Sequence, residues 1–202
     1  LDFSPIFIPG LVCSADLFAA QLSGVDHPVA PRVADTLGRD SLAEMATEAL
    51  AGVTGMVVPI GLSMGGYVAL EMARLAPARI SAMALFSTNC RQDNDAQRAY
   101  REQAIRLAQR DGFRGVTRQF LGKFLSPHAL ADTALVDGVL AMAEEIGRVT
   151  FARQQHAISW RRAQHDTLAS IKVPLSIVCG INDRLTPPAL SQEMADLAPH
   201  AD

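Results

Sequence analysis

One serine stands at the spacing that nucleophilic catalysis requires. Residues 61–66 read Gly-Leu-Ser-Met-Gly-Gly, so Ser63 has Gly61 two positions before it and Gly65 two positions after it. The apolar run of residues 56–60 precedes this segment, and a run with helical character follows it. A strand, a sharp turn that carries one serine, and a helix together form a nucleophile elbow, which needs small residues at both of those positions. We therefore predict that Ser63 is a nucleophile, with a helix cap or a plain turn as the structural alternative.

The start of the following helix offers a way to stabilise negative charge. The first N–H groups of a helix have no partner within the helix, and here they would lie beside the Ser63 hydroxyl. The N–H of Met64 is the natural first donor of an oxyanion hole, the pair of donors that stabilises a tetrahedral intermediate. We expect Ser63 and Met64 to act together.

Apolar runs and helical stripes alternate along the chain, which is typical of a mostly parallel sheet with helices on its faces. Strands are expected at residues 6–8, 28–34, 56–60, 80–86 and 174–179. Pro59 lies inside the third of these strands, where proline removes a ladder hydrogen bond, so we expect a bulge or an early strand end there. A capping box at residues 41–44 should open a helix that ends at Gly52, and Thr186 should cap the final helix.

Residues 90–166 contain no strand pattern, and their apolar spacing is helical throughout. We therefore predict an all-helical insertion between two strands of the sheet. Its three apolar stripes are Tyr100, Ala104, Leu107 and Ala108; Phe113, Val116, Phe120 and Phe124; and Leu135, Val139, Met142 and Ile146. This interpretation divides the chain into a core domain of residues 1–89, the helical insertion of residues 90–166, and a second part of the core, residues 167–202.

The composition favours one soluble globular domain. The chain has 202 residues, of which 49% are hydrophobic and 19% are charged, which excludes a disordered protein and allows one sizeable core. Its net charge of −3 gives no electrostatic reason to expect nucleic acid or an anionic membrane as a partner. We therefore expect a small-molecule partner, and we leave a homodimer open.

The cysteines and the first residues bear on the compartment. Cys13, Cys90 and Cys179 are odd in number and far apart, which predicts reduced thiols and neither a disulfide framework nor a zinc site. The sequence does not start with a basic segment followed by an apolar one, and no apolar run approaches about 18 residues. We expect a cytoplasmic protein.

Three loops and the helical insertion together resemble the α/β-hydrolase superfamily. The loops are residues 7–11 (Phe-Ile-Pro-Gly-Leu), the elbow at Ser63, and residues 178–188, where Val-Cys-Gly is followed by Asp183 and two prolines. The chain is most similar to small carboxylesterases of the pimeloyl-carrier methyl esterase and lactonase-like group. The resemblance implies an α/β-hydrolase fold in which the insertion forms a cap over the serine, and it implies no metal and no organic cofactor.

The resemblance also assigns roles to two loop residues. In the family the catalytic triad runs Ser, Asp, His in chain order. Asp183 matches the acid, so it is expected to orient a histidine and stabilise its charge, and the alternative is an ordinary turn residue. The turn Pro9-Gly10-Leu11 is similar to the family's His-Gly-x loop, whose third residue donates the second oxyanion N–H. Leu11 is therefore the candidate donor, with Val12 as the neighbouring alternative and a tight turn without a catalytic role as the structural one.

The catalytic histidine is the member of the triad that is hardest to place. The five histidines are His27, His128, His156, His165 and His200. Only His200 follows Asp183, and it stands at a helix end, whereas the family's histidine follows one more strand in a Gly-His pair. His156 and His165 would need an unusual triad order. The resemblance therefore places the histidine beyond Asp202, with the C-terminal strand and helix of the fold missing from these 202 residues.

The implied function is a serine hydrolase that cleaves a small carboxylic ester through an acyl-enzyme intermediate. A C–C bond hydrolase, a lyase and a cofactor-free perhydrolase on the same fold are alternatives, because fold does not fix function. A non-catalytic ligand-binding protein is a further alternative if the histidine is truly absent. Epoxide hydrolases and haloalkane dehalogenases are disfavoured, because their elbow has Asp where this chain has Ser63.

The insertion offers two further hypotheses. Phe120, Phe124 and Trp160 are candidates for lining the acyl pocket, with helix packing as their first role. The arginines between Arg98 and Arg118 could dock a substrate carboxylate or an acidic carrier, and a solvated helix face is the alternative.

Overall fold

A computed structural model describes residues 3–24, 28–110 and 116–202 of the chain. At its centre lies a five-stranded sheet with the order β2-β1-β3-β4-β5, and every strand pairing in it is parallel. The strands are β1 (Phe3–Ile8), β2 (Arg32–Val33), β3 (Met56–Leu62), β4 (Met83–Phe86) and β5 (Leu175–Val178). The predicted parallel sheet is therefore present, although β2 is shorter than residues 28–34 and β4 starts later than residue 80.

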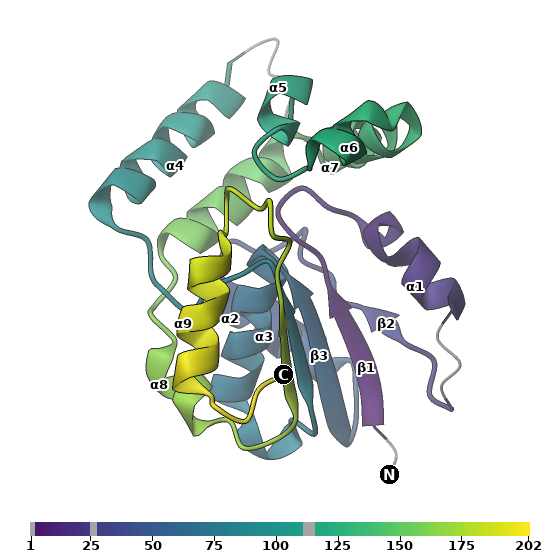
Figure 1. The fold of residues 1–202 in the computed structure, drawn as a ribbon, viewed down its shortest axis with the longest axis vertical. Helices are drawn as coiled ribbons and strands as arrows, with labels where there is room; N and C mark the ends of the chain where they lie inside the picture. The colour runs from purple at the N-terminus through teal and green to yellow at the C-terminus, as the bar shows by residue number, and fades with distance from the viewer. Residues whose placement is uncertain (1–2, 25–27, 111–115) are drawn as a thin grey trace.

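Helices cover both faces of the sheet (Figure 1). On one side lies α1 (Ala19–Gly24), preceded by a short 3₁₀ turn, Ala15–Phe18, and on the other lie the remaining helices of the core. These are α2 (Leu42–Ala51), α3 (Met64–Leu75), which a second 3₁₀ turn, Pro77–Arg79, follows, and α9 (Pro188–Leu197). Residues 64–73 of α3 are all buried, as expected for a helix enclosed between a sheet and other helices.

The predicted effect of Pro59 on β3 is wrong. The strand runs without a bulge to Leu62, and Pro59 pairs in register with Ile6 of β1. On the other side of β3 the continuous ladder to β4 begins only at Ile60, opposite Ala84. The ladder between β3 and β4 therefore loses no hydrogen bond to the missing N–H of Pro59, because it begins after this residue.

Both predicted side-chain caps are also wrong. Ser41 stands at the N-cap of α2, but its side chain makes no capping hydrogen bond. Pro187 occupies the N-cap of α9, and the Thr186 hydroxyl donates to Asp183 instead. In both cases the helix is fixed by packing, with Met45 and Met194 fully buried.

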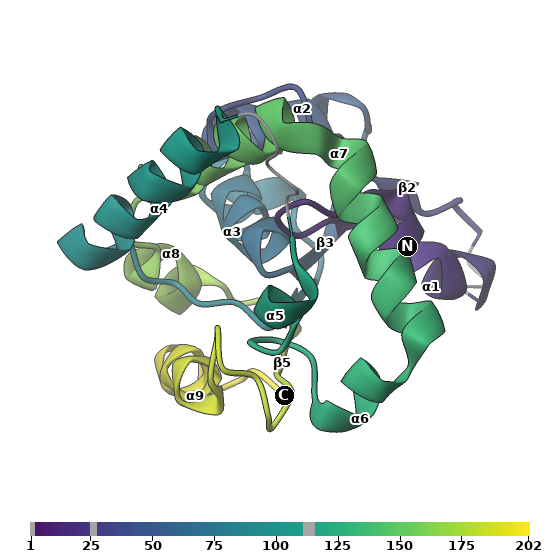
Figure 2. The ribbon, with the colours of Figure 1, turned by 90° about the horizontal axis from the view of Figure 1, so that it is seen from above.

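Between β4 and β5 the described residues contain helices and no strand. These helices are α4 (Asp95–Ala108), α5 (Arg118–Leu121), α6 (Pro127–Ala131), α7 (Thr133–Ser159) and α8 (His165–Ser170). Seen from above, α4, α7 and α6 form an arc over the carboxyl end of the sheet (Figure 2). We call residues 90–166 the helical segment; its standing as a separate domain stays a prediction.

The helix α7 is divided by Gly147. This glycine has a φ of 73°, in the left-handed region that favours glycine, and the helix kinks there. Val136 and Ala143 before the kink and Phe151 after it belong to a small hydrophobic cluster over the sheet, whereas Ala157 and Ile158 at the end of the helix belong to the main core. One helix thus joins the two hydrophobic clusters.

Several residues of the predicted stripes face solvent. Tyr100, Leu107 and Leu135 are exposed, whereas Ala108 and Ile146 are buried in the small cluster. Phe113 lies outside the described residues. The helical period of the first and third stripes is confirmed by α4 and α7, but α5 spans only Arg118–Leu121, so Val116 and Phe124 of the second stripe lie outside a helix.

A buried ion network joins the two ends of the helical segment and contacts the core through one of its arginines. Asp93 is fully buried and forms ion pairs with Arg101 of α4 and with Arg161, which follows α7. The Arg161 guanidinium also lies over the ring of Tyr67 in α3, 4.3 Å from its centroid. The network therefore connects α4, the end of α7 and α3.

Among the described helices, none is both long and apolar enough to cross a membrane.

Candidate active site

Ser63 occupies a strained turn between β3 and α3. Its φ is 52°, a value rare for residues other than glycine and costly by about 1–2 kcal/mol. Neighbouring backbone holds it there: the Ser63 N–H donates to Phe86 O at 2.9 Å, and the Ser63 carbonyl accepts from Gly66 N–H at 2.9 Å and from the Thr88 hydroxyl at 2.8 Å. Ser63 remains partly exposed. This is the geometry of a nucleophile elbow.

The glycines of the elbow are required by close contacts. A Cβ atom on Gly61 would overlap the carbonyl of Gly65, and one on Gly65 would overlap the carbonyl of Ile8 in β1. A Cβ on Gly66 would lie 2.5 Å from the Thr88 hydroxyl oxygen. Sequence reasoning assigned a role to the first two of these glycines, and the doubled glycine was the available signal for the third.

The loop after β1 passes beside the elbow. A Cβ on Gly10 would lie 3.7 Å from the Cβ of Ser63, which is ordinary contact. Within this loop the Val12 N–H donates to the side chain of Gln154 at 2.9 Å, so Val12 is not a free donor. Among the described residues no hydrogen-bond partner is found for the Leu11 N–H. Of the two predicted donors in this loop, Leu11 is therefore the one whose N–H is unbonded among the described residues, and the oxyanion roles of Leu11 and Met64 stay predictions.

Asp183 lies in the loop after β5 and is held by three donors. Its Oδ1 accepts from the N–H groups of Leu185 and Thr186, both at 2.9 Å, and its Oδ2 accepts from the Thr186 hydroxyl at 2.8 Å. Thr186, buried and missed as a site residue, fixes the direction of this carboxylate. An ordinary turn would use the same backbone bonds. What distinguishes Asp183 is its place at the edge of the sheet.

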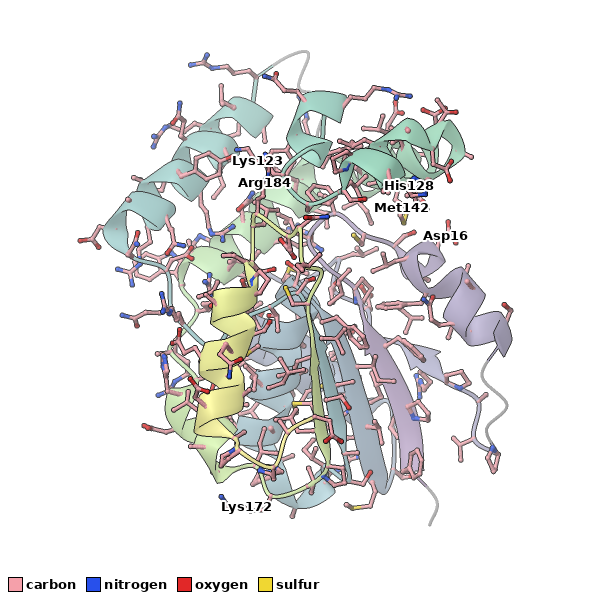
Figure 3. All side chains as sticks on the ribbon, in the orientation of Figure 1. Asp16, Lys123, His128, Met142, Lys172 and Arg184 are labelled. Carbon is pink, nitrogen blue, oxygen red and sulfur yellow. The ribbon has the colours of Figure 1, made fainter. Side chains whose placement is uncertain are left out.

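The sheet brings the three loops to one edge. The carboxyl ends of parallel strands meet at the same edge, and β3, with the elbow, lies between β1 and β4. Backbone bonds continue from the elbow to the acid strand, because Ser63 binds Phe86 and the next residue, Ser87, donates to Val178 O at 2.8 Å. The acid loop also meets the helical segment, since Arg184 N–H donates to Lys123 O at 3.2 Å (Figure 3).

No described histidine binds Asp183. His128 is exposed in α6, His156 lies near Trp160, His165 pairs with Glu193 at 3.1 Å, and the His200 ring nitrogen lies 3.1 Å from the Val173 carbonyl. His27 lies outside the described residues. The general base therefore stays a prediction from the family's chain order.

One cluster outside this site has metal-binding residue types. Ligand atoms of Cys90, His165 and Glu193 lie within 4.8 Å of one another. Glu193 is already bound by Arg91, at 2.8 and 3.0 Å, and this bond lowers the pKa of the carboxyl group. Burial raises the pKa of the Cys90 thiol to about 11. In the structure the cluster is held together by the pairing of Glu193 with Arg91 and with His165.

The arginines and aromatic residues of the helical segment, which the sequence suggested for docking and for lining a pocket, differ in their partners and in their exposure. Arg98, Arg101, Arg106 and Arg118 each pair with an acidic side chain. The pairs of Arg98, Arg106 and Arg118 lie at the surface and favour the solvated-face interpretation over a docking site, whereas Arg101 belongs to the buried ion network around Asp93. Trp160 is 72% exposed, whereas Phe120 and Phe124 pack against the small cluster that contains Val12.

Comparison with known proteins agrees with this architecture. Residues 39–202 match the model of the Hydrolase_4 family, described as serine aminopeptidase, S33. Over 100% of this chain and 79% of the other, the structure is similar to a thermophilic esterase from Thermogutta terrifontis, with a TM-score of 0.89 and 21% identity. It is also similar to a hydrolase from Pseudomonas aeruginosa PA01, with a TM-score of 0.80 and 22% identity over 99% of this chain and 79% of the other. For the enol-lactonase from Burkholderia xenovorans LB400 the TM-score is 0.79 and the identity 19%, over 98% of this chain and 80% of the other. No curated protein sequence matches.

Proposed function

The chain belongs to the Hydrolase_4 (serine aminopeptidase, S33) family of α/β-hydrolases, and from that premise we propose that it cleaves small carboxylic esters with Ser63 as nucleophile. The observation that carries the proposal is the strained φ of Ser63 beside a loop whose Leu11 N–H has no partner among the described residues. A backbone donor without a partner, in a loop that contacts the serine of a strained elbow, is what an oxyanion hole for acyl transfer would use.

The proposed reaction has two halves. The Ser63 hydroxyl oxygen attacks the ester carbonyl carbon while a histidine, oriented by Asp183, takes the hydroxyl proton. The N–H groups of Leu11 and Met64 stabilise the oxyanion of the tetrahedral intermediate, which collapses to an acyl-enzyme as the alcohol leaves with that proton. Water, deprotonated by the same histidine, then attacks the acyl-enzyme, releases the acid and restores Ser63.

An ester is favoured over an amide by the solved structures with similar folds. Two of the three named above are an esterase and an enol-lactonase, both of which act on ester bonds. The family description, by contrast, names an aminopeptidase. Parallel assays with a short-chain p-nitrophenyl ester and an aminoacyl p-nitroanilide separate these two activities, and we expect turnover of the ester.

Covalent labelling tests the nucleophile. The full-length gene product, treated with a fluorophosphonate, should gain one adduct by intact mass, and Ser63→Ala should gain none. Ser87→Ala is the matched control, because Ser87 also has a positive φ, 43°, at the same edge of the sheet, and this variant should keep the adduct. An adduct on Ser63→Ala, or a wild-type protein with neither adduct nor ester turnover, would overturn the proposal.

A further inference from the structure

We propose that Gln154 is a positioning residue that, from the helical segment, fixes the Leu11 N–H as an oxyanion donor. Gln154 lies in α7 after the Gly147 kink and is fully buried. It touches no reacting atom and acts through the loop of residues 10–13. The inference rests on the proposed function, because that function gives the loop its role.

The side-chain amide of Gln154 joins two segments that are far away in sequence. Its Oε1 accepts from the Val12 N–H at 2.9 Å, and its Nε2 donates to the Thr36 carbonyl at 3.2 Å. These partners determine the orientation of the amide, because a backbone N–H can only donate and a carbonyl can only accept. A glutamine is therefore required here as an acceptor on one side and a donor on the other.

Val12 shows what the bond to Gln154 holds. Its φ is 53°, which is unfavourable for a β-branched residue, and its side chain is buried. Such a conformation persists only where the surroundings enforce it. Without the Gln154 acceptor, the Val12 N–H would lack a partner, at a cost of about 1–3 kcal/mol if it stayed buried. The loop would then relax toward a less strained backbone.

Relaxation of Val12 would move the donor. The peptide before Leu11 is held because the Gly10 carbonyl accepts from the Cys13 N–H at 3.2 Å, and the peptide after Leu11 is held by Gln154. Peptide groups are planar, so fixing one polar atom of each group also fixes the direction of the other. The Leu11 N–H is thus directed from both sides while remaining unbonded itself.

Substitution of Gln154 in the full-length gene product tests this role. Gln154→Met keeps the length of the side chain but removes both hydrogen bonds, and Gln154→Glu keeps an acceptor for Val12. The matched control is Gln155→Met, because Gln155 is the next residue of α7, is also buried, and binds Arg101 instead of the loop. The measurements are kcat and KM for a p-nitrophenyl ester and the affinity for a boronic acid, which forms a tetrahedral adduct on a catalytic serine.

We expect Gln154→Met to lower kcat about 10- to 100-fold, less than the 10²–10³-fold typical of deleting a donor outright. Boronic acid affinity should fall in parallel, KM should stay within about twofold of wild type, and Gln154→Glu should recover part of kcat. Gln155→Met should retain kcat and boronic acid affinity. Should Gln154→Met fail to fold, Gln154→Asn, which shortens the side chain by one methylene, replaces it with the same expectations.

The failures are distinguishable. A wild-type protein without a Ser63 adduct or ester turnover overturns the proposed function and this inference together. An active wild type whose folded Gln154 variants match Gln155→Met in kcat and boronic acid affinity overturns this inference alone. A change confined to KM also overturns it, because it would assign Gln154 to substrate binding.

Discussion

At the scale of single residues, the elbow depends on glycines, because a Cβ atom at these positions would overlap neighbouring atoms. Gly65 allows the start of α3 to touch β1, and no side chain fits between them. We expect Gly65→Ala to destabilise the protein by at least about 2 kcal/mol, because the overlapping atom is a backbone carbonyl, which cannot swing away. Urea unfolding measures the loss.

Gly138 provides the control for this substitution. It lies in α7, and a Cβ there would meet no atom within 4 Å. Gly138→Ala should be neutral or stabilising by up to about 1 kcal/mol, because alanine favours the helix. Equal stability of the two alanine variants would contradict our account of the elbow.

The thiols of Cys13 and Cys90 should be unreactive in the folded protein. Burial raises the pKa of each from the ordinary value of 9.0 to about 11. At pH 8 their thiolate fraction, and so their alkylation rate, should be about 100-fold below that of the unfolded chain. Between pH 9 and 11 only the unfolded state ionises, so these thiols should make stability fall with rising pH. Peptide mass spectrometry after iodoacetamide, with and without urea, measures the rates; equal rates would contradict the prediction.

Some site residues can be predicted from the sequence because a local pattern marks them, and others cannot because their role depends on a distant contact. Ser63 and its glycines form a local pattern, so a short window of sequence suffices. Gln154 acts on Val12 across 142 positions, and nothing around it distinguishes it from other polar helix residues. Thr186 was visible but misassigned, because a threonine before two prolines is equally typical of a helix cap.

At the scale of elements, Asp93 joins α4 to the end of α7 within the helical segment. We expect Asp93→Ala to cost about 3–5 kcal/mol, because it leaves the guanidinium groups of Arg101 and Arg161 without their buried acidic partner. Denaturant unfolding monitored by fluorescence measures the change.

An exposed ion pair within α4 provides the comparison. Asp95 of α4 pairs with Arg98 at 3.5 Å at the surface. Asp95→Ala should cost at most about 1 kcal/mol. If both variants lose the same stability, the buried ion network stabilises the protein no more than a surface pair does.

At the scale of the whole molecule, the parallel sheet followed from the alternation of strand and helix patterns alone. The ends of the elements did not, because they depend on contacts between distant segments. The ladder between β3 and β4, for example, begins at Ile60 and so does not include Pro59. The path of the helical segment was equally hidden, since helical spacing sets a period but not the side on which each stripe is covered.

The kink at Gly147 also bears on how such enzymes could be recombined. Before the kink α7 packs over the sheet, and after it the same helix enters the main core and carries Gln154. A chimaera that imports a foreign segment up to residue 146 would keep Gln154 but would replace most of the small cluster against which Leu11 and Val12 pack. One joined after residue 159 would also replace the anchor of the loop beside Ser63, so Gly147 is the crossover point that keeps the Gln154–Val12 hydrogen bond.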